Sequence, residues 1–92
     1  MDKIRRHVYI EGRVQGVGFR SSVRYKAQEF NINGWAKNLY DGRVEAIFTG
    51  FKDDVNKILK YVKHGPRFAR VNSVDIREEE YRNKFNSFQI KF

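Results

Sequence analysis

The sequence contains no cysteine, and this absence excludes three classes of protein at once. Without thiols the chain has no disulfides, no zinc site built on thiolates and no cysteine nucleophile. Two histidines are also too few to make a metal site by themselves. We therefore expect a protein without a metal or another cofactor, held together by its hydrophobic core.

Long hydrophobic runs are absent too, because no apolar stretch approaches the ~20 residues that span a bilayer. The segment from Met1 to His7 also lacks the hydrophobic stretch of a secretion signal. Both absences predict a cytoplasmic protein that does not associate with membranes. A chain of 92 residues has room for one core, so residues 1–92 are expected to form a single domain and a monomer.

The sequence also lacks a balance of charge, since 19 lysines and arginines stand against 11 aspartates and glutamates, a net charge of +8. An excess of positive charge favours an anionic partner. Charge alone suits a nucleic acid and a small phosphorylated metabolite equally well. The hydrophobic share of 40% is that of an ordinary globular chain, so the arrangement of residues must decide between these partners.

Alternation of apolar and polar residues predicts five strands, and helical spacing predicts two helices. The expected strands cover residues 6–11, 35–40, 43–49, 69–77 and 88–92. The first helix is expected to have its cap at Ser21 or Ser22 and to bury Val23, Ala27 and Phe30. The second helix, flanked by acidic residues and a Gly-Pro pair, is predicted from apolar residues at positions 55, 58, 59 and 62.

Two irregularities are expected within the strands. Asp41-Gly42 predicts a tight hairpin turn between the second and third strands, in which the backbone needs positive φ. Val71 and Val74 are out of step by one residue, which predicts a bulge or a register change near Asn72. The order β-α-β-β-α-β with an added strand predicts an α+β fold, a ferredoxin-like sandwich with two helices on one face of a mainly antiparallel sheet.

A glycine-rich loop between the first strand and the first helix is the candidate functional segment. Gly12, Gly16 and Gly18 allow positive φ and a close approach of the backbone to a ligand, so successive amides can surround an anion. Arg20 follows at the start of the helix, where its guanidinium can bind two phosphate oxygens. The loop matches neither a Walker A motif nor a dinucleotide fingerprint. A loop that merely turns the chain, with Arg20 in solvent, remains an alternative at this point.

Two segments together resemble the signatures of one known family, the acylphosphatases. The first signature resembles the segment Gly12-x-Val14-Gln15-Gly16-Val17-Gly18-Phe19-Arg20. The second signature resembles the run Gly34-Trp35-Ala36-Lys37-Asn38-Leu39-Tyr40-Asp41-Gly42-Arg43-Val44, together with Gly50. Both segments are long and occur in the family's order, and the resemblance covers nearly the whole chain.

The resemblance implies an enzyme that hydrolyses acyl phosphates to a carboxylate and inorganic phosphate, with phosphate as a product inhibitor. It assigns the grip on the phosphate to Arg20 and the orientation of the attacking water to Asn38. The substrate-binding cradle would be formed by the backbone amides of Gln15, Gly16, Val17, Gly18, Phe19 and Arg20. Leu39 departs from the family, which often has a small polar residue there, so local hydrogen bonding is in doubt.

An RNA-recognition module is the competing interpretation, because it shares this topology and has an aromatic octamer that the segment from Gly16 to Arg20 superficially resembles. That octamer lies on the third strand, whereas these glycines follow the first. We therefore expect no nucleic-acid partner. An interaction module without catalysis is disfavoured because Arg20 and Asn38 are both present.

Other polar and aromatic residues are given structural interpretations. His7 is expected on the outward face of a strand and His64 at the end of a helix, where a cation is favoured. The run from Glu78 to Glu80 is expected in a solvated loop. The aromatic residues expected in the sheet and core are Trp35, Phe48, Phe88 and Phe92.

Overall fold

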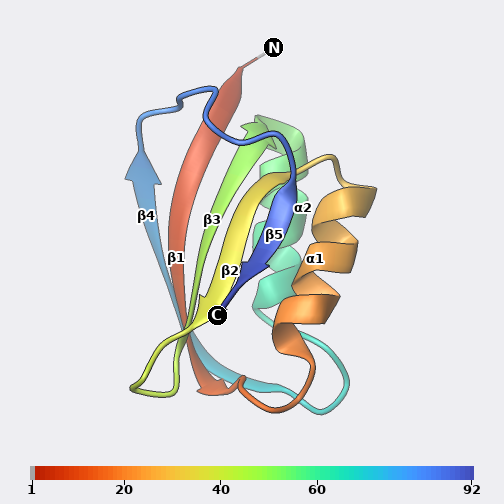
Figure 1. The fold of residues 1–92 in the computed structure, drawn as a ribbon, viewed down its shortest axis with the longest axis vertical. Coiled ribbons are helices and arrows are strands. Elements are labelled where there is room, and N and C mark those ends of the chain that lie inside the picture. The colour runs from red at the N-terminus through yellow and green to blue at the C-terminus, as the bar shows by residue number, and fades with distance from the viewer. Residues whose placement is uncertain (1) are drawn as a thin grey trace.

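The computed structural model describes residues 2–92, whose five strands form one sheet with two helices on one of its faces (Figure 1). The strands are β1 (Lys3–Arg13), β2 (Asn33–Asn38), β3 (Val44–Phe51), β4 (Arg70–Glu79) and β5 (Phe88–Lys91), and the helices are α1 (Phe19–Glu29) and α2 (Lys52–Val62). The strand order is β4-β1-β3-β2-β5, and only β2 and β5 pair in parallel. The α+β, ferredoxin-like prediction is therefore confirmed.

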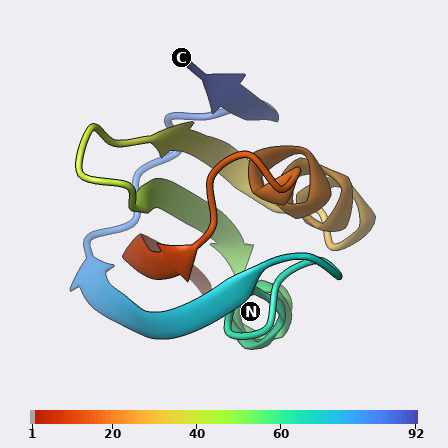
Figure 2. The same ribbon diagram turned by 90° about the horizontal axis from the view of Figure 1, so that it is seen from below.

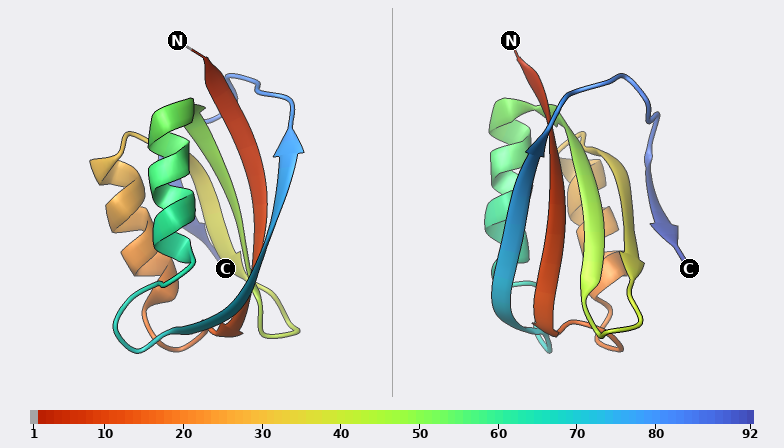
Figure 3. Two further views of the ribbon diagram at one scale, coloured as in Figure 1. Left: turned by 180° about the vertical axis from the view of Figure 1, so that it is seen from behind. Right: turned by 90° about the vertical axis from the view of Figure 1, so that its left-hand side faces the viewer.

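The core lies between the two helices and the sheet, as the alternating and helical patterns predict. Both helices cover the same face of the sheet, and the other face is open (Figure 3). The buried core side chains of β1, β3 and the two helices include Val8, Ile10, Val44, Ala46, Phe48, Val23, Ala27, Val55, Ile58 and Val62. Neither α1 nor α2, the helices of the described residues, has the length and hydropathy needed to cross a bilayer.

The start of α1 differs from the prediction, since the helix is capped by Gly18 and not by Ser21 or Ser22. Gly18 adopts a left-handed conformation with φ 74°, and its carbonyl accepts a 3.0 Å hydrogen bond from the amide of Ser22. The cause is Phe19, which is 2% exposed and packs into the core ahead of Val23. Burial of this ring begins the helix early and places its N-terminus directly at the glycine loop.

The predicted bulge in β4 is confirmed. Glu11 of β1 faces Ser73, whereas the next residue, Gly12, faces Val71, so Asn72 is the extra residue. A side chain at Gly12 would put its Cβ 2.1 Å from the carbonyl oxygen of Arg70. Glycine at this position therefore allows the close approach that the bulge requires.

The hairpin between β2 and β3 is longer than the predicted turn. The amide of Gly42 donates a 3.2 Å hydrogen bond to the carbonyl of Leu39, so Tyr40 and Asp41 are the central residues of the turn. Gly42 follows with φ 96° and closes a longer loop, which corrects its predicted place inside the turn. The amide of Leu39 then donates to the carbonyl of Arg43 at 2.8 Å and closes the base of the hairpin.

The glutamates predicted in a solvated loop are partly within the sheet, because Glu78 and Glu79 belong to β4. Glu79 Oε1 accepts a 2.8 Å hydrogen bond from Arg5, and its other oxygen lies 2.7 Å from His7 Nδ1. The second nitrogen of His7 lies 2.6 Å from Glu45. The hydrogen bond with Arg5 is the main cause that holds the pKa of the Glu79 carboxyl below its ordinary value, and the hydrogen bond with His7 is the second cause.

Replacing Glu79 with glutamine is expected to lower the free energy of unfolding at pH 7 by up to about 1 kcal/mol, since a half-exposed ion pair contributes little more. A carboxyl with a depressed folded-state pKa stabilises the fold above its unfolded-state pKa of about 4.3 and loses this effect as the pH falls through the folded-state value. The difference between wild type and variant should therefore be present at pH 7 and shrink below about pH 4. Urea denaturation checks this, with Glu80→Gln as the matched control. A difference that is constant down to pH 2 would contradict it.

Candidate functional site

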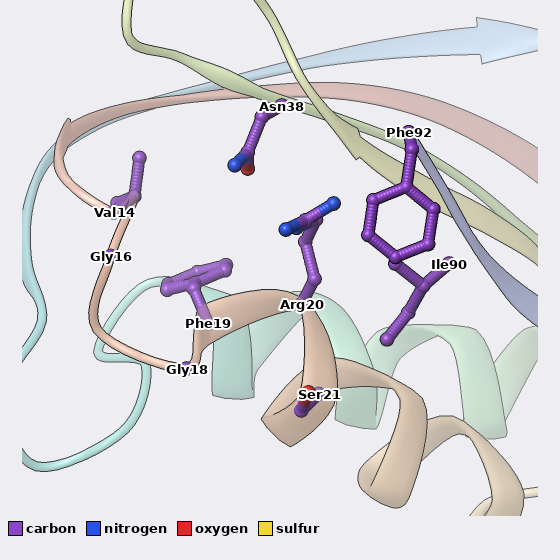
Figure 4. A pocket seen from close by; sticks show the side chains of 9 residues that line it. All are labelled: Val14, Gly16, Gly18, Phe19, Arg20, Ser21, Asn38, Ile90 and Phe92. Carbon is purple, nitrogen blue, oxygen red and sulfur yellow. The ribbon is translucent and has the colours of Figure 1, made fainter.

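A pocket of about 220 Å³ lies where the loop after β1, the end of β2 and the end of β5 meet. Its lining consists of Val14, Gly16, Gly18, Phe19, Arg20, Ser21, Asn38, Ile90 and Phe92. Figure 4 shows the side chains of Arg20 and Asn38 directed into the same space from opposite sides. The two predicted catalytic residues, which are 18 positions apart in the sequence, thus share one pocket.

The loop of residues 14–18 leads from β1 into the N-terminus of α1 (Figure 2). It presents a row of free backbone amides. Within the described residues, no amide from Gln15 to Arg20 donates a hydrogen bond to a backbone carbonyl. Gly16 and Gly18 have φ of 73° and 74°, left-handed values that turn successive amides toward one side of the chain. The first turn of α1 adds the partial positive charge of a helix N-terminus. This arrangement is suited to an anion.

The Arg20 guanidinium is held at the pocket by the end of the sheet. Its Nη1 donates a 3.1 Å hydrogen bond to the carbonyl of Lys91, and the guanidinium carbon lies 5.0 Å from the centre of the Phe92 ring. No carboxylate forms an ion pair with Arg20 among residues 2–92. A fixed, half-buried guanidinium without a counter-ion is a binding site for the oxygens of a phosphate.

Asn38 is the last residue of β2 and contributes an orphaned polar atom. Its Oδ1 is buried and has no hydrogen-bond partner among the described residues. A buried acceptor without a donor costs about 1–3 kcal/mol, so such atoms in folded proteins call for an explanation. An acceptor that faces the guanidinium across a small pocket is placed to hold a water molecule there.

Gln15 connects the loop to the hairpin that carries Asn38. Its Nε2 donates to the carbonyl of Leu39 at 2.7 Å and to the carbonyl of Arg43 at 3.0 Å. The sequence suggested only a role for the backbone amide of Gln15. The side-chain bonds had no signal in the sequence, because they depend on how close the loop and the hairpin lie.

Several lining residues were not predicted. Ser21 was expected as a helix cap, and nothing in the sequence placed Ile90 or Phe92 beside Arg20. Phe92 was expected in the sheet and core but is fully exposed, because β5 ends at Lys91. The parallel pairing of β5 with β2 brings these residues to the pocket, and this pairing has no local sequence signature.

The pocket contains no acidic, histidine or lysine side chain. Within residues 2–92 there is also no group of three histidine, aspartate or glutamate side chains that could hold a metal ion. Ser21 therefore has no neighbouring base to activate it as a nucleophile. The arrangement can bind a tetrahedral oxyanion and orient a water molecule, which is the requirement for direct transfer of a phosphoryl group to water.

Comparison with known proteins shows the same family along the whole chain. The family model described as Acylphosphatase matches residues 6–90. An acylphosphatase from Syntrophobacter fumaroxidans is 46% identical over 92 residues, covering 100% of this chain and 95% of that protein. One from a Roseiflexus species is 48% identical over 90 residues, covering 98% and 97%. The crystal structure of acylphosphatase from Bacillus subtilis superposes with a TM-score of 0.93 at 32% identity, covering 97% of this chain and 99% of that chain.

Proposed function

The chain belongs to the acylphosphatase family and hydrolyses the carboxyl-phosphate anhydride bond of acyl phosphates, and from this premise we propose which of its residues carry out the reaction. Arg20 and the amides of residues 15–20 bind the phosphoryl group, and Asn38 orients the attacking water. The observation that carries this proposal is the meeting of Arg20, the free amides and the unpartnered Asn38 Oδ1 at one pocket of about 220 Å³.

The phosphoryl group supplies three oxygens on which charge must be stabilised during transfer. The loop amides donate from the backbone, and the guanidinium of Arg20 adds a fixed positive charge. A hydrogen bond to the carbonyl of Lys91 orients that guanidinium before the substrate arrives, so little reorganisation is needed. Inorganic phosphate carries the same oxygens, so we propose that the product competes with the substrate for this cradle.

The attacking water is held by the Asn38 carboxamide in line with the bond between phosphorus and the leaving oxygen. The Oδ1 atom accepts a hydrogen bond from this water, which aims an oxygen lone pair at phosphorus. A carboxamide is too weak a base to take the proton, so the proton passes to an oxygen of the transferred phosphoryl group. The new bond joins water oxygen to phosphorus, and the bond that breaks releases the carboxylate.

The leaving group makes further catalytic groups unnecessary. The leaving carboxylate is a weak base, because its conjugate acid has a low pKa, so it departs without a general acid. This fits a pocket that contains no acidic side chain. We propose that turnover needs no metal ion, since charge neutralisation comes from Arg20 and the amides. We propose a monomer of one domain as the active unit.

The test is hydrolysis of benzoyl phosphate in EDTA and in water enriched in oxygen-18. We expect the rate in EDTA to equal the rate without it, and the label to appear in the phosphate, because water attacks phosphorus. Mass spectrometry of both products gives the answer in a single reaction. Label in the benzoate would place the attack on the carbonyl carbon and contradict the proposal, and a rate lost in EDTA and restored by Mg²⁺ would contradict its metal-free part.

A further inference from the structure

The side chain of Gln15 bridges the two segments that carry the proposed catalytic groups. Its amide group has two hydrogens, and both are used on backbone carbonyls of the β2–β3 hairpin. These carbonyls belong to Leu39 and Arg43. The carbonyl of Arg43 also accepts a hydrogen bond from the amide of Leu39. The bonds span 24 and 28 residues of sequence, so they fix a tertiary distance and not a local turn.

No other hydrogen bond joins the loop of residues 14–18 to this hairpin within the described part of the chain. Val14 and Phe19 are buried at the two ends of the loop, whereas a Cβ added to Gly16 or Gly18 would meet nothing within 4 Å, so packing does not confine these two positions. Leu39 directly follows Asn38, and its carbonyl is the closer of the two acceptors. The carboxamide of Gln15 therefore sets the position of the loop amides relative to Asn38.

We propose that the Gln15 side chain is a positioning residue for hydrolysis: it holds the Asn38 carboxamide at the distance from the amide cradle that in-line attack requires. The inference rests on the proposed role of Asn38. Attack needs the water and the phosphorus aligned within a fraction of an ångström, whereas binding of phosphate needs only the cradle and Arg20. The two functions can thus be separated by experiment.

The first variant is Gln15→Met, which keeps the length of the side chain and removes both donors. We expect kcat for benzoyl phosphate to fall about tenfold to hundredfold, the range expected when reacting groups are displaced by about 1 Å. The inhibition constant of inorganic phosphate should change much less than kcat, because the substitution removes neither a backbone amide of the cradle nor Arg20.

The decisive measurement is a double-mutant cycle with Asn38→Ala. If Gln15 acts by placing Asn38, the Gln15→Met change should have almost no effect on kcat once the carboxamide of Asn38 is gone. If Gln15 supports the loop in general, the two losses should multiply. Losses that multiply would overturn the inference. It would also be overturned if the inhibition constant of phosphate in Gln15→Met rose by the same factor by which kcat fell.

The outcomes also separate this inference from the function on which it rests. A single variant Asn38→Ala with the kcat of wild type would show that the proposed role of Asn38 is wrong. A low kcat in Asn38→Ala with independent effects of Gln15→Met would leave that role intact and remove only the positioning role. Thermal unfolding of each variant is the control for folding. We expect the Gln15 variants to stay folded, because Gln15 lies on a surface loop and not in the core.

Discussion

Replacing Asn38 with alanine is expected to lower kcat for benzoyl phosphate about 100- to 1000-fold while KM changes little, as found when one preorganised polar group is removed from an active site. The cradle and Arg20 remain, so the phosphoryl end of the substrate still binds. The water, in contrast, loses the acceptor that aims it at phosphorus. Steady-state kinetics with benzoyl phosphate measures both constants.

The same variant is expected to keep the stability of wild type. No protein group among the described residues donates to Asn38 Oδ1, so its removal breaks no hydrogen bond of the fold to that atom. Activity should therefore fall without a matching loss of stability, which distinguishes a catalytic loss from a folding defect. Asn56→Ala, on the exposed face of α2, is the matched control and should keep both kinetic constants. An Asn38→Ala variant with the kcat of wild type would refute the assigned role.

Replacing Arg20 with alanine is expected to lower kcat/KM by about 10⁴, because a single arginine on a transferred phosphoryl group contributes 10³ to 10⁵ in related chemistry. Both KM and kcat should be affected, since the guanidinium binds the ground state and stabilises the charge of the transition state. The inhibition constant of inorganic phosphate should rise with KM. Direct titration of the protein with inorganic phosphate measures this binding contribution without any turnover.

Two further variants make the Arg20 prediction specific. Arg20→Lys retains the charge but not the planar pair of donors, so it should recover only part of the phosphate affinity. Arg24→Ala removes an exposed guanidinium one turn further along α1, outside the pocket, and should behave as wild type apart from a small electrostatic effect. An Arg20→Ala variant that is inhibited by phosphate as strongly as wild type would show that the arginine does not bind the anion.

Much of the fold follows from local patterns in the sequence. The helical spacing of apolar residues in α2 and the alternation of apolar residues in β1 and β3 predicted these elements, because each has one buried face. Val71 and Val74, which are out of step by one residue, predicted the irregularity in β4. The start of α1 was missed although Phe19, Val23 and Ala27 have helical spacing, because the neighbouring glycines suggested a longer loop. Glu78 and Glu79 were assigned to solvent because charge masks a strand whose side chains pair across the ladder.

The site divides in a similar way. The residue pattern predicted the glycine loop and Arg20, and the resemblance to the acylphosphatases added Asn38. The structure brings these two side chains to one pocket, and their catalytic roles remain predictions. The contribution of β5 and the side-chain bonds of Gln15 were not predictable. These features depend on pairing between distant segments, and distant pairing leaves no periodic trace in a single sequence.

The contact between Arg20 and β5 has a consequence for how the enzyme acquires activity as it folds. The hydrogen bond from Arg20 to the carbonyl of Lys91 joins residues 71 positions apart, whereas α1 itself forms through local contacts. Contacts between distant segments close late, because the entropy of a long loop must first be lost. During refolding, helical signal is thus expected to return before the guanidinium is anchored, and recovery of turnover would report the docking of the sheet's last strand.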